Sequence, residues 1–381
     1  MDNNHKQPEF VPGLKLAGSF FHDEVKPILM SHYPDLLYSA GLIGSGSDVV
    51  GFDDEMSTDH AWGPRMMLFL GPEDFETKKD SIREVLSQEL PTTYLGYSTN
   101  FSEPEPDSSQ ILQSVDSRPI NHGVKTYTID GFFANYINID ISKNLHPVDW
   151  LALPHHKLRA ITSGRVFHDD IGLNDIRTRF SWYPHDVWLF ILASTWKRIG
   201  QEEHLMGRAG YVGDENGSAI IGSRIARDIM RLTFLMEKEY PPYAKWFGTA
   251  FSQLRSAGEL TTYITDILHA TSWKERETSL CNAYEYLARI HNSLGITAPI
   301  LAKVSQFHER PFKIIQGETI AKTIIEQIKD PEIVSLDKTY EDKIDLRTRR
   351  RPIGNIDLIS DNTDLLEGKT LPQVLKAHYT D

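Results

Sequence analysis

The fold of this chain is decided by residues 44–65, which read GSGSDVVGFDDEMSTDHAWGPR. The apolar run at 36–43 predicts a buried strand that leads directly into the Gly-Ser turn at 44–45. A second strand is expected to begin near Asp59 and to continue through the apolar residues at 66–70. The predicted order is therefore strand, Gly-Ser turn, short connection, and a strand that starts at a carboxylate.

This order suits a site for a nucleoside triphosphate. Gly44, Ser45 and Ser47 would let backbone N–H groups and hydroxyls approach the phosphates closely. Transfer of a phosphoryl or nucleotidyl group mainly requires positioning and neutralisation of charge. Two carboxylates two residues apart on a strand share one face, so they can bind magnesium together. Asp59 supplies the first, but the position of the second is Ala61.

A third carboxylate from a neighbouring strand usually completes such a site. Asp130 is the best-placed candidate, because it follows a third strand predicted over 124–129. The alternative is that Asp130 only caps the helix expected from 132 to 137. The acidic run at 53–55 is interpreted as a solvated turn, with metal binding as the alternative.

Composition limits the partners of the chain. Its 381 residues carry a formal net charge of −13, so nucleic acid is not an expected partner. Cys281 is the only cysteine, which excludes an internal disulfide framework and a Cys-rich zinc site. No apolar run reaches the roughly 18 residues of a membrane span, and the first ten residues lack a secretory pattern. We expect a cytoplasmic protein without a membrane partner.

Three regions are predicted along the chain. Residues 1–145 are expected to form an α+β domain that begins with a helix over 14–32, which Pro27 delays or kinks, and that contains a mobile insertion at 97–121. Residues 146–330 are expected to be helical, and 331–381 to be an irregular tail packed over the body. The helices of the second region are expected at 147–160, 184–205, 217–240, 242–257, 260–270, 273–293 and 319–329.

Several sequence blocks together resemble the family called domain of unknown function 4037, within the nucleotidyltransferase-like superfamily. Besides 44–65 they are DWLALPHHKL (149–158), SGRVFHDDIG (163–172), YPHDVWLFILASTWKRIGQEEHLMGRAGYVGDENGS (183–218), PPYAKWFGTAF (241–251) and GNIDLISDNTDLLEG (354–368). The resemblance implies a polymerase-β-like nucleotidyltransferase domain with a mixed sheet, followed by an all-helical domain. The family motif of the second strand reads DHDWGPR, and this chain departs from it only at Ala61. That alanine is either natural or an introduced Asp→Ala change.

Basic residues outside the turn are candidate phosphate ligands. Arg65 ends the strand motif, and Arg208 lies between glycines that would let it approach a triphosphate. The alternative for Arg208 is pairing with a neighbouring carboxylate. Lys245 starts a predicted helix beside aromatic residues and either contacts substrate or covers the surface. A stripe of arginines either lines a cleft or bridges to acidic neighbours: Arg224, Arg227 and Arg231.

Three functions follow, in order of preference. The first is a Mg²⁺-dependent nucleotidyltransferase that moves a nucleoside monophosphate from an NTP, ATP first, to an acceptor hydroxyl of a small molecule or protein, and that Ala61 has inactivated. The second is a non-catalytic nucleotide-binding or regulatory module. The third is an HD-type metal phosphohydrolase using His155, His156 and the run His168-Asp169-Asp170.

Overall fold

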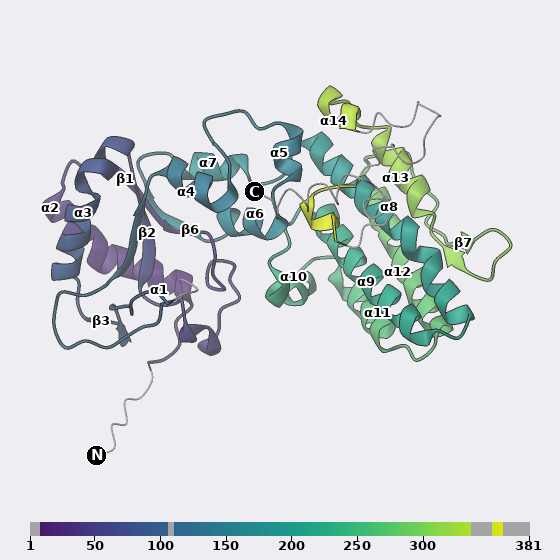
Figure 1. The fold of residues 1–381 in the computed structure, drawn as a ribbon, viewed down its shortest axis with the longest axis horizontal. Coiled ribbons are helices and arrows are strands. Elements are labelled where there is room, and N and C mark those ends of the chain that lie inside the picture. The colour runs from purple at the N-terminus through teal and green to yellow at the C-terminus, as the bar shows by residue number, and fades with distance from the viewer. Residues whose placement is uncertain (1–7, 106–109, 337–352, 361–381) are drawn as a thin grey trace, which may run out of the picture. The chain divides into compact units, whose positions relative to one another are not determined.

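The computed structural model describes residues 8–105, 110–336 and 353–360 (Figure 1). They form two compact units. The first comprises Met1–Asn144 and His156–Ser181, and the second Leu145–His155 and Trp182–Asp381. None of the helices in the described ranges has the length and apolar character of a membrane span.

The first unit is an α+β structure built on a mixed sheet, as the family resemblance implies, and this sheet has four strands. The strand order is β5-β2-β1-β6. Strands β2 and β5 are parallel, whereas β1 is antiparallel to both of its neighbours. The strands are β1 (Tyr38–Leu42), β2 (Arg65–Leu70), β5 (Gly123–Tyr127) and β6 (Arg165–Asp169).

One face of this sheet packs on helices. The side chains of Leu68 and Leu70 share a buried core with Ile82 and Leu86 of α3 (Pro72–Glu89) and with Phe20. The N-terminal helical path runs without a break through α1 (Gly13–Phe20), a π-helical segment (Phe21–Val25) and α2 (Lys26–His32). The predicted late start is therefore wrong, because the helix continues through a π-helical segment directly before Pro27, where the regular hydrogen-bond ladder is already interrupted.

The first unit also contains a segment that the sequence assigned to the helical region. Strand β6 pairs with the second edge of β1, with Ser39 opposite Asp169. Helices α6 (His155–Thr162) and α7 (Leu173–Arg179) flank that strand. The predicted boundary at residue 145 therefore differs from the observed division, since strand pairing draws 156–181 into the sheet. The helix expected over 147–160 is interrupted at Pro154, leaving α5 (Pro147–Leu151) and α6.

The insertion at 97–121 is anchored in its described part. A small hairpin of β3 (Thr93–Tyr94) and β4 (Tyr97–Ser98) leads into it. Isolated bridges then join Asn100 to His122 and Phe101 to Leu112, and Phe101 is 5% exposed. These anchors are single residues without an apolar period, so the sequence pattern missed them. After β5 the chain forms α4 (Ile129–Ile137).

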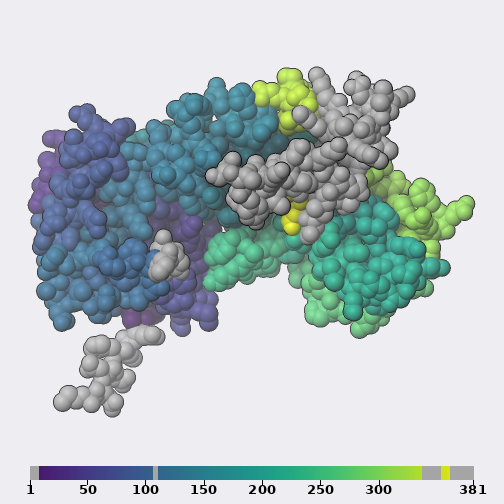
Figure 2. Space-filling model, viewed as in Figure 1, coloured from purple at the N-terminus to yellow at the C-terminus, as the bar shows by residue number. Residues whose placement is uncertain are grey.

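The second unit is a set of packed helices with one short hairpin, β7 (Ser305–Gln306) and β8 (Lys313–Ile314), that projects from them (Figure 1, Figure 2). The hairpin was not predicted, and neither was the break of the helix expected over 242–257. The helices are α8 (His185–Tyr211), α9 (Glu215–Glu237), a 3-10 turn (Ala244–Trp246), α10 (Phe247–Ser252), α11 (Ala257–His269), α12 (Trp273–Ser293), α13 (Gly317–Ile325) and α14 (Pro331–Leu336).

Helices α8 and α13 approach closely at two glycines. A Cβ on Gly317 would lie 2.5 Å from the Trp196 carbonyl oxygen, and one on Gly200 would lie 2.6 Å from the Glu318 nitrogen. Glu203, which is 5% exposed, accepts hydrogen bonds from the N–H groups of Ile315 (2.6 Å) and Gly317 (3.2 Å). Burial raises the pKa of the Glu203 carboxyl to about 7.

The expected tail at 331–381 is described only in part. Beyond α14, a short 3-10 turn (Ile356–Leu358) packs within the second unit. Arg198, which is 2% exposed, donates to the Ser360 carbonyl at 2.9 Å and pairs with Asp228 at 2.7 Å. Residues 337–352 and 361–381 lie outside the described residues.

Candidate functional site

The turn after β1 is shaped by glycine and pinned by two helices of the first unit. Gly44 has a φ of +87°, in the region that glycine adopts with little strain. Its N–H donates to the Ala160 carbonyl of α6 at 3.0 Å. The exposed Ser45 hydroxyl lies 3.0 Å from the Tyr136 hydroxyl of α4. The turn is therefore rigidly placed and still presents a hydroxyl to solvent.

A buried ion pair closes the far side of this turn. Asp48 is 2% exposed, and Arg65 Nη2 donates to its two carboxylate oxygens at 2.7 and 2.8 Å. A Cβ on Gly46 would collide with the Asp48 carboxylate, so the ion pair itself requires glycine there. One guanidinium nitrogen of Arg65, Nη2, is therefore already bound to Asp48 within the fold. The sequence did not single out Asp48, although it directly follows the Gly-Ser run.

The acidic residues after the turn serve the fold. Asp53 Oδ2 accepts from the Gly13 N–H at 2.7 Å and from Trp62 Nε1 at 3.0 Å. Asp54 is the N-cap of a 3-10 turn (Glu55–Asp59) and accepts from the N–H groups of Met56 and Ser57. The interpretation of 53–55 as merely solvated is corrected for both aspartates, since each one fixes the loop.

Asp59 and Ala61 lie in the loop before β2 and not on the strand. Asp59 ends the 3-10 turn, and its carboxylate lies 2.8 Å from His60 Nδ1, with both side chains more than 60% exposed. Ala61 has a φ of +47°, whereas β2 begins only at Arg65. The predicted strand start is therefore wrong, and strand alternation cannot place positions 59 and 61 on one face. Aspartate and asparagine tolerate this left-handed conformation better than alanine does.

The second face of the sheet carries positive charge at the end where the Gly-Ser turn lies. Arg65 and Met67 alternate along β2 on this face, and Lys125 of β5 pairs with Met67. Burial and the charge of nearby Arg65 lower the pKa of the Lys125 ammonium. The ring of Phe132 of α4 contacts Phe69 on this face and also reaches the turn, 3.4 Å from the position of a Cβ on Gly44. We call the part of this face around Ser45, Arg65, Met67 and Lys125 the open face.

Lys125 and Tyr136 were missed in the sequence, although a signal for Lys125 existed. Successive residues of a strand point to opposite faces, so the predicted strand VKTYTI (124–129) places a lysine on one of its two faces. Only the register of β5 against β2 shows that this face is also the one that carries Arg65. For Tyr136, no local pattern links α4 to Ser45.

The structure does not bring Asp130 to the turn. Asp130 follows the end of β5 that pairs with Phe69, whereas Gly44 follows the end of β1 that lies beside Arg65 and Met67. The two positions are therefore at opposite ends of the sheet. Asp130 is exposed in the first turn of α4, and Thr128 is the N-cap of that helix, accepting from the Gly131 N–H at 3.0 Å.

Arg208 and Lys245 belong to the second unit, and both are exposed. Arg208 lies on α8 and not in a glycine loop. A Cβ on Gly207 would lie 2.8 Å from the Phe312 ring, so this glycine serves helix packing. Lys245 Nζ lies 4.8 Å from the centroid of the Trp246 ring, as expected for a lysine that covers the surface.

The arginine stripe of α9 bridges to acidic neighbours. Arg224 Nη2 lies 2.5 Å from Glu202, and Arg231 Nη1 lies 3.6 Å from Asp228. Glu202 and Asp228 are both buried, so the stripe neutralises carboxylates inside the second unit.

The described residues contain no group of three or more His, Cys, Asp or Glu side chains that could hold a metal ion. The donors near the turn do not fit magnesium, because Asp48 is bound by Arg65 and Asp53 by Trp62, while Asp59 contacts His60.

For the HD-type alternative, His168 Nε2 lies 2.7 Å from Asp170, and Asp169 caps α7 through three backbone N–H groups. His155 belongs to the second unit, where Asn355 contacts it at 2.8 Å.

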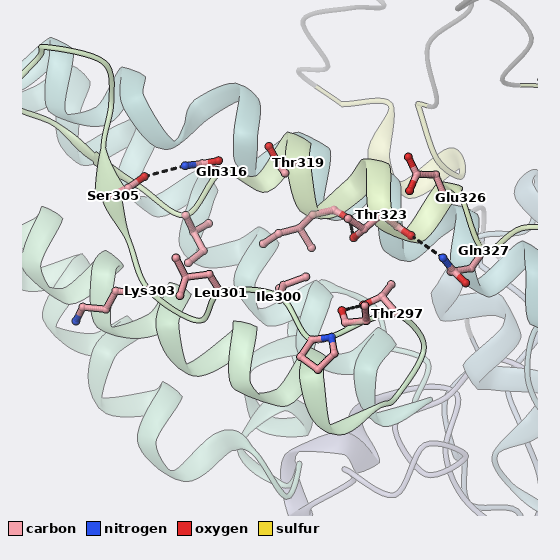
Figure 3. A pocket seen from close by; sticks show the side chains of 14 residues that line it. Thr297, Ile300, Leu301, Lys303, Ser305, Gln316, Thr319, Thr323, Glu326 and Gln327 are labelled. Carbon is pink, nitrogen blue, oxygen red and sulfur yellow. Dashed lines mark hydrogen bonds between the residues drawn. The ribbon is translucent and has the colours of Figure 1, made fainter.

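The second unit contains a pocket of about 370 Å³ between α13 and the segment at 297–305 (Figure 3). Its wall combines the exposed Leu301 with threonines of α13, among them Thr319 and Thr323. None of the residues that the sequence assigned to the nucleotide site lines this pocket.

Comparison with known proteins gives a family match and distant similarity to solved structures. Residues 150–247 match the family described as Domain of unknown function (DUF4037), which confirms the resemblance seen in the sequence. No curated protein matches the chain. A solved nucleotidyltransferase-like protein from Exiguobacterium sibiricum 255-15 is 8% identical, covers 83% of this chain and 91% of its own, and has a TM-score of 0.31. The fold given above therefore rests on this chain's own strands and helices.

Proposed function

We propose that the first unit binds the phosphates of a nucleoside triphosphate, ATP being the first candidate, on the open face of its sheet. The observation that carries this proposal is the position of the Gly44–Ser45 turn beside Arg65 and Lys125 at one end of one face. Hydroxyl, amide and cationic donors at one place are the groups that phosphate oxygens require. The resemblance to the nucleotidyltransferase-like superfamily supports the same assignment.

We further propose that transfer of a nucleoside monophosphate requires a carboxylate at position 61. In such a transfer the acceptor hydroxyl oxygen forms a bond to the α-phosphorus, the bond to pyrophosphate breaks, and the hydroxyl proton leaves to solvent. Ala61 has no oxygen ligand, and Asp59 alone faces solvent beside His60. With this donor set, the chain as it stands acts as a nucleotide-binding module.

The test is to compare the chain with Ala61→Asp and Ala61→Asn. Both changes suit the left-handed backbone at position 61, but only the first adds a charged oxygen ligand. With ATP and Mg²⁺, we expect Ala61→Asp to release pyrophosphate roughly 10²-fold faster than Ala61→Asn, because a metal ligand contributes several kcal/mol. Calorimetry should detect ATP binding by all three proteins.

A second measurement separates binding from chemistry. Lys125→Gln should weaken ATP binding about tenfold, since it removes a cation from the open face. Lys143→Gln is the control, because Lys143 is exposed and pairs with Asp140 in the same unit. If Ala61→Asp binds ATP but releases no pyrophosphate, the proposed nucleotide binding stands and the proposed nucleotidyl transfer is refuted. Absence of ATP binding in every variant would refute both.

A further inference from the structure

Another cavity, which belongs to the first unit, lies along β5. This strand is the last in the sheet order, so one of its edges faces the cavity instead of another strand. The volume is about 450 Å³, which is within the range of small-molecule sites. Its wall combines residues of α3, the segment around Glu103, and the strand from His122 to Tyr127.

Three cations line this cavity although the chain carries a net charge of −13: Lys79, Arg83 and Lys125. Within the described ranges Arg83 and Lys125 form no ion pair, and Lys79 only approaches Glu76 at 3.9 Å. Positive side chains without a close carboxylate partner in a concave wall provide a place for an anionic group.

One wall of the cavity is rigid and neutral. His122 Nε2 lies 3.1 Å from the Arg83 carbonyl oxygen, and its Nδ1 accepts from the Val124 N–H at 3.2 Å. Burial lowers the pKa of His122, so the ring is uncharged at neutral pH. It therefore joins α3 to β5 and fixes the spacing of the cations on those two elements.

We propose that this cavity binds the acceptor: a small molecule that carries hydroxyl groups and a phosphate or carboxylate. Lys79 and Arg83 would hold the anionic group. Asp80 and Glu103, which also line the cavity, would accept hydrogen bonds from the hydroxyls. Lys125 lines this cavity and also lies on the same face of the sheet as Arg65, so one side chain borders both proposed sites. The role as acceptor site rests on the proposed function, whereas anion binding does not.

The experiment uses the full chain, with inorganic phosphate and glucose 6-phosphate as probes in calorimetry. We expect millimolar binding of phosphate and tighter binding of glucose 6-phosphate. Lys79→Gln and Arg83→Gln should each weaken both about tenfold, because each removes a charge-assisted contact. Lys78→Gln is the matched control, since Lys78 is the neighbouring residue on α3, pairs with Asp74 at 2.6 Å, and is not part of the wall.

The outcomes separate this proposal from the nucleotide site. Equal phosphate affinities of Arg83→Gln and Lys78→Gln, or no phosphate binding at millimolar concentrations, would overturn the anion site. ATP binding tests the open face independently of this result. A parallel loss of ATP affinity in Arg83→Gln would show that the cavity holds nucleotide phosphates, which overturns the acceptor role. Phosphate binding by a chain that does not bind ATP would also overturn that role and the proposed function, leaving only an anion site.

Discussion

Replacing Arg65 by methionine tests whether the buried ion pair with Asp48 holds the Gly-Ser turn. The substitution keeps much of the side-chain volume but leaves a carboxylate that is 2% exposed without its cation. Breaking a buried pair in this way costs about 3–5 kcal/mol. Arg65 is 16% exposed, and Asp48 Oδ1 keeps a hydrogen bond from the Val49 N–H at 2.9 Å. We therefore expect the lower end of that range, about 3 kcal/mol.

The assay is hydrogen exchange by mass spectrometry, which resolves the two units. A loss of about 3 kcal/mol should accelerate exchange of peptides from β1 and β2 roughly 10²-fold, because 1.4 kcal/mol is a factor of ten. Peptides from α9 in the second unit provide the internal control. In a double-mutant cycle, Asp48→Asn should recover most of the loss, since it removes the unpaired charge. Acceleration below tenfold, or equal acceleration in α9, would refute the assignment.

Two further predictions concern the second unit. Because the pKa of Glu203 is raised to about 7, its contribution to stability is fully present below the unfolded pKa near 4.5 and is lost as the pH rises through 7. The free energy of unfolding from urea titrations should therefore fall over this window by up to about 3 kcal/mol, and Glu203→Gln should flatten its pH dependence; an unchanged pH dependence would contradict the assignment. Gly317→Ala should lower stability by about 1–3 kcal/mol, because its Cβ would lie 2.5 Å from the Trp196 carbonyl. The control, Gly258→Ala, meets nothing within 4 Å and should leave the thermal midpoint unchanged or slightly higher; equal losses in both would exclude close packing as the cause.

The main elements of the first unit could be predicted because their patterns are local. The apolar run at 36–43 and the glycine after it place β1 and its turn, and the apolar residues at 66–70 place β2. The start of β2 could not be found in this way. The 3-10 turn (Glu55–Asp59) depends on hydrogen bonds to Asp54, and polar segments of this kind carry no period that separates a turn from a strand end.

Strand β6 shows why the unit boundary could not be read from the sequence. The residues HDD at 168–170 are polar, so the segment lacks the apolar run of a buried strand. It becomes a strand because β1 has a second edge whose N–H and C=O groups need partners. The need arises in the folded sheet and not in the segment itself.

The sequence by itself determined the Gly-Ser turn between two strands, the helical character of much of the second half, and the alanine at position 61. Each of these depends on residue types a few positions apart, which fix local backbone preference. Only the tertiary structure decided that Arg65 pairs with Asp48, that Lys125 shares its face, and that Asp130 lies at the opposite end of the sheet. Those relations depend on strand order and register, which contacts between distant segments set.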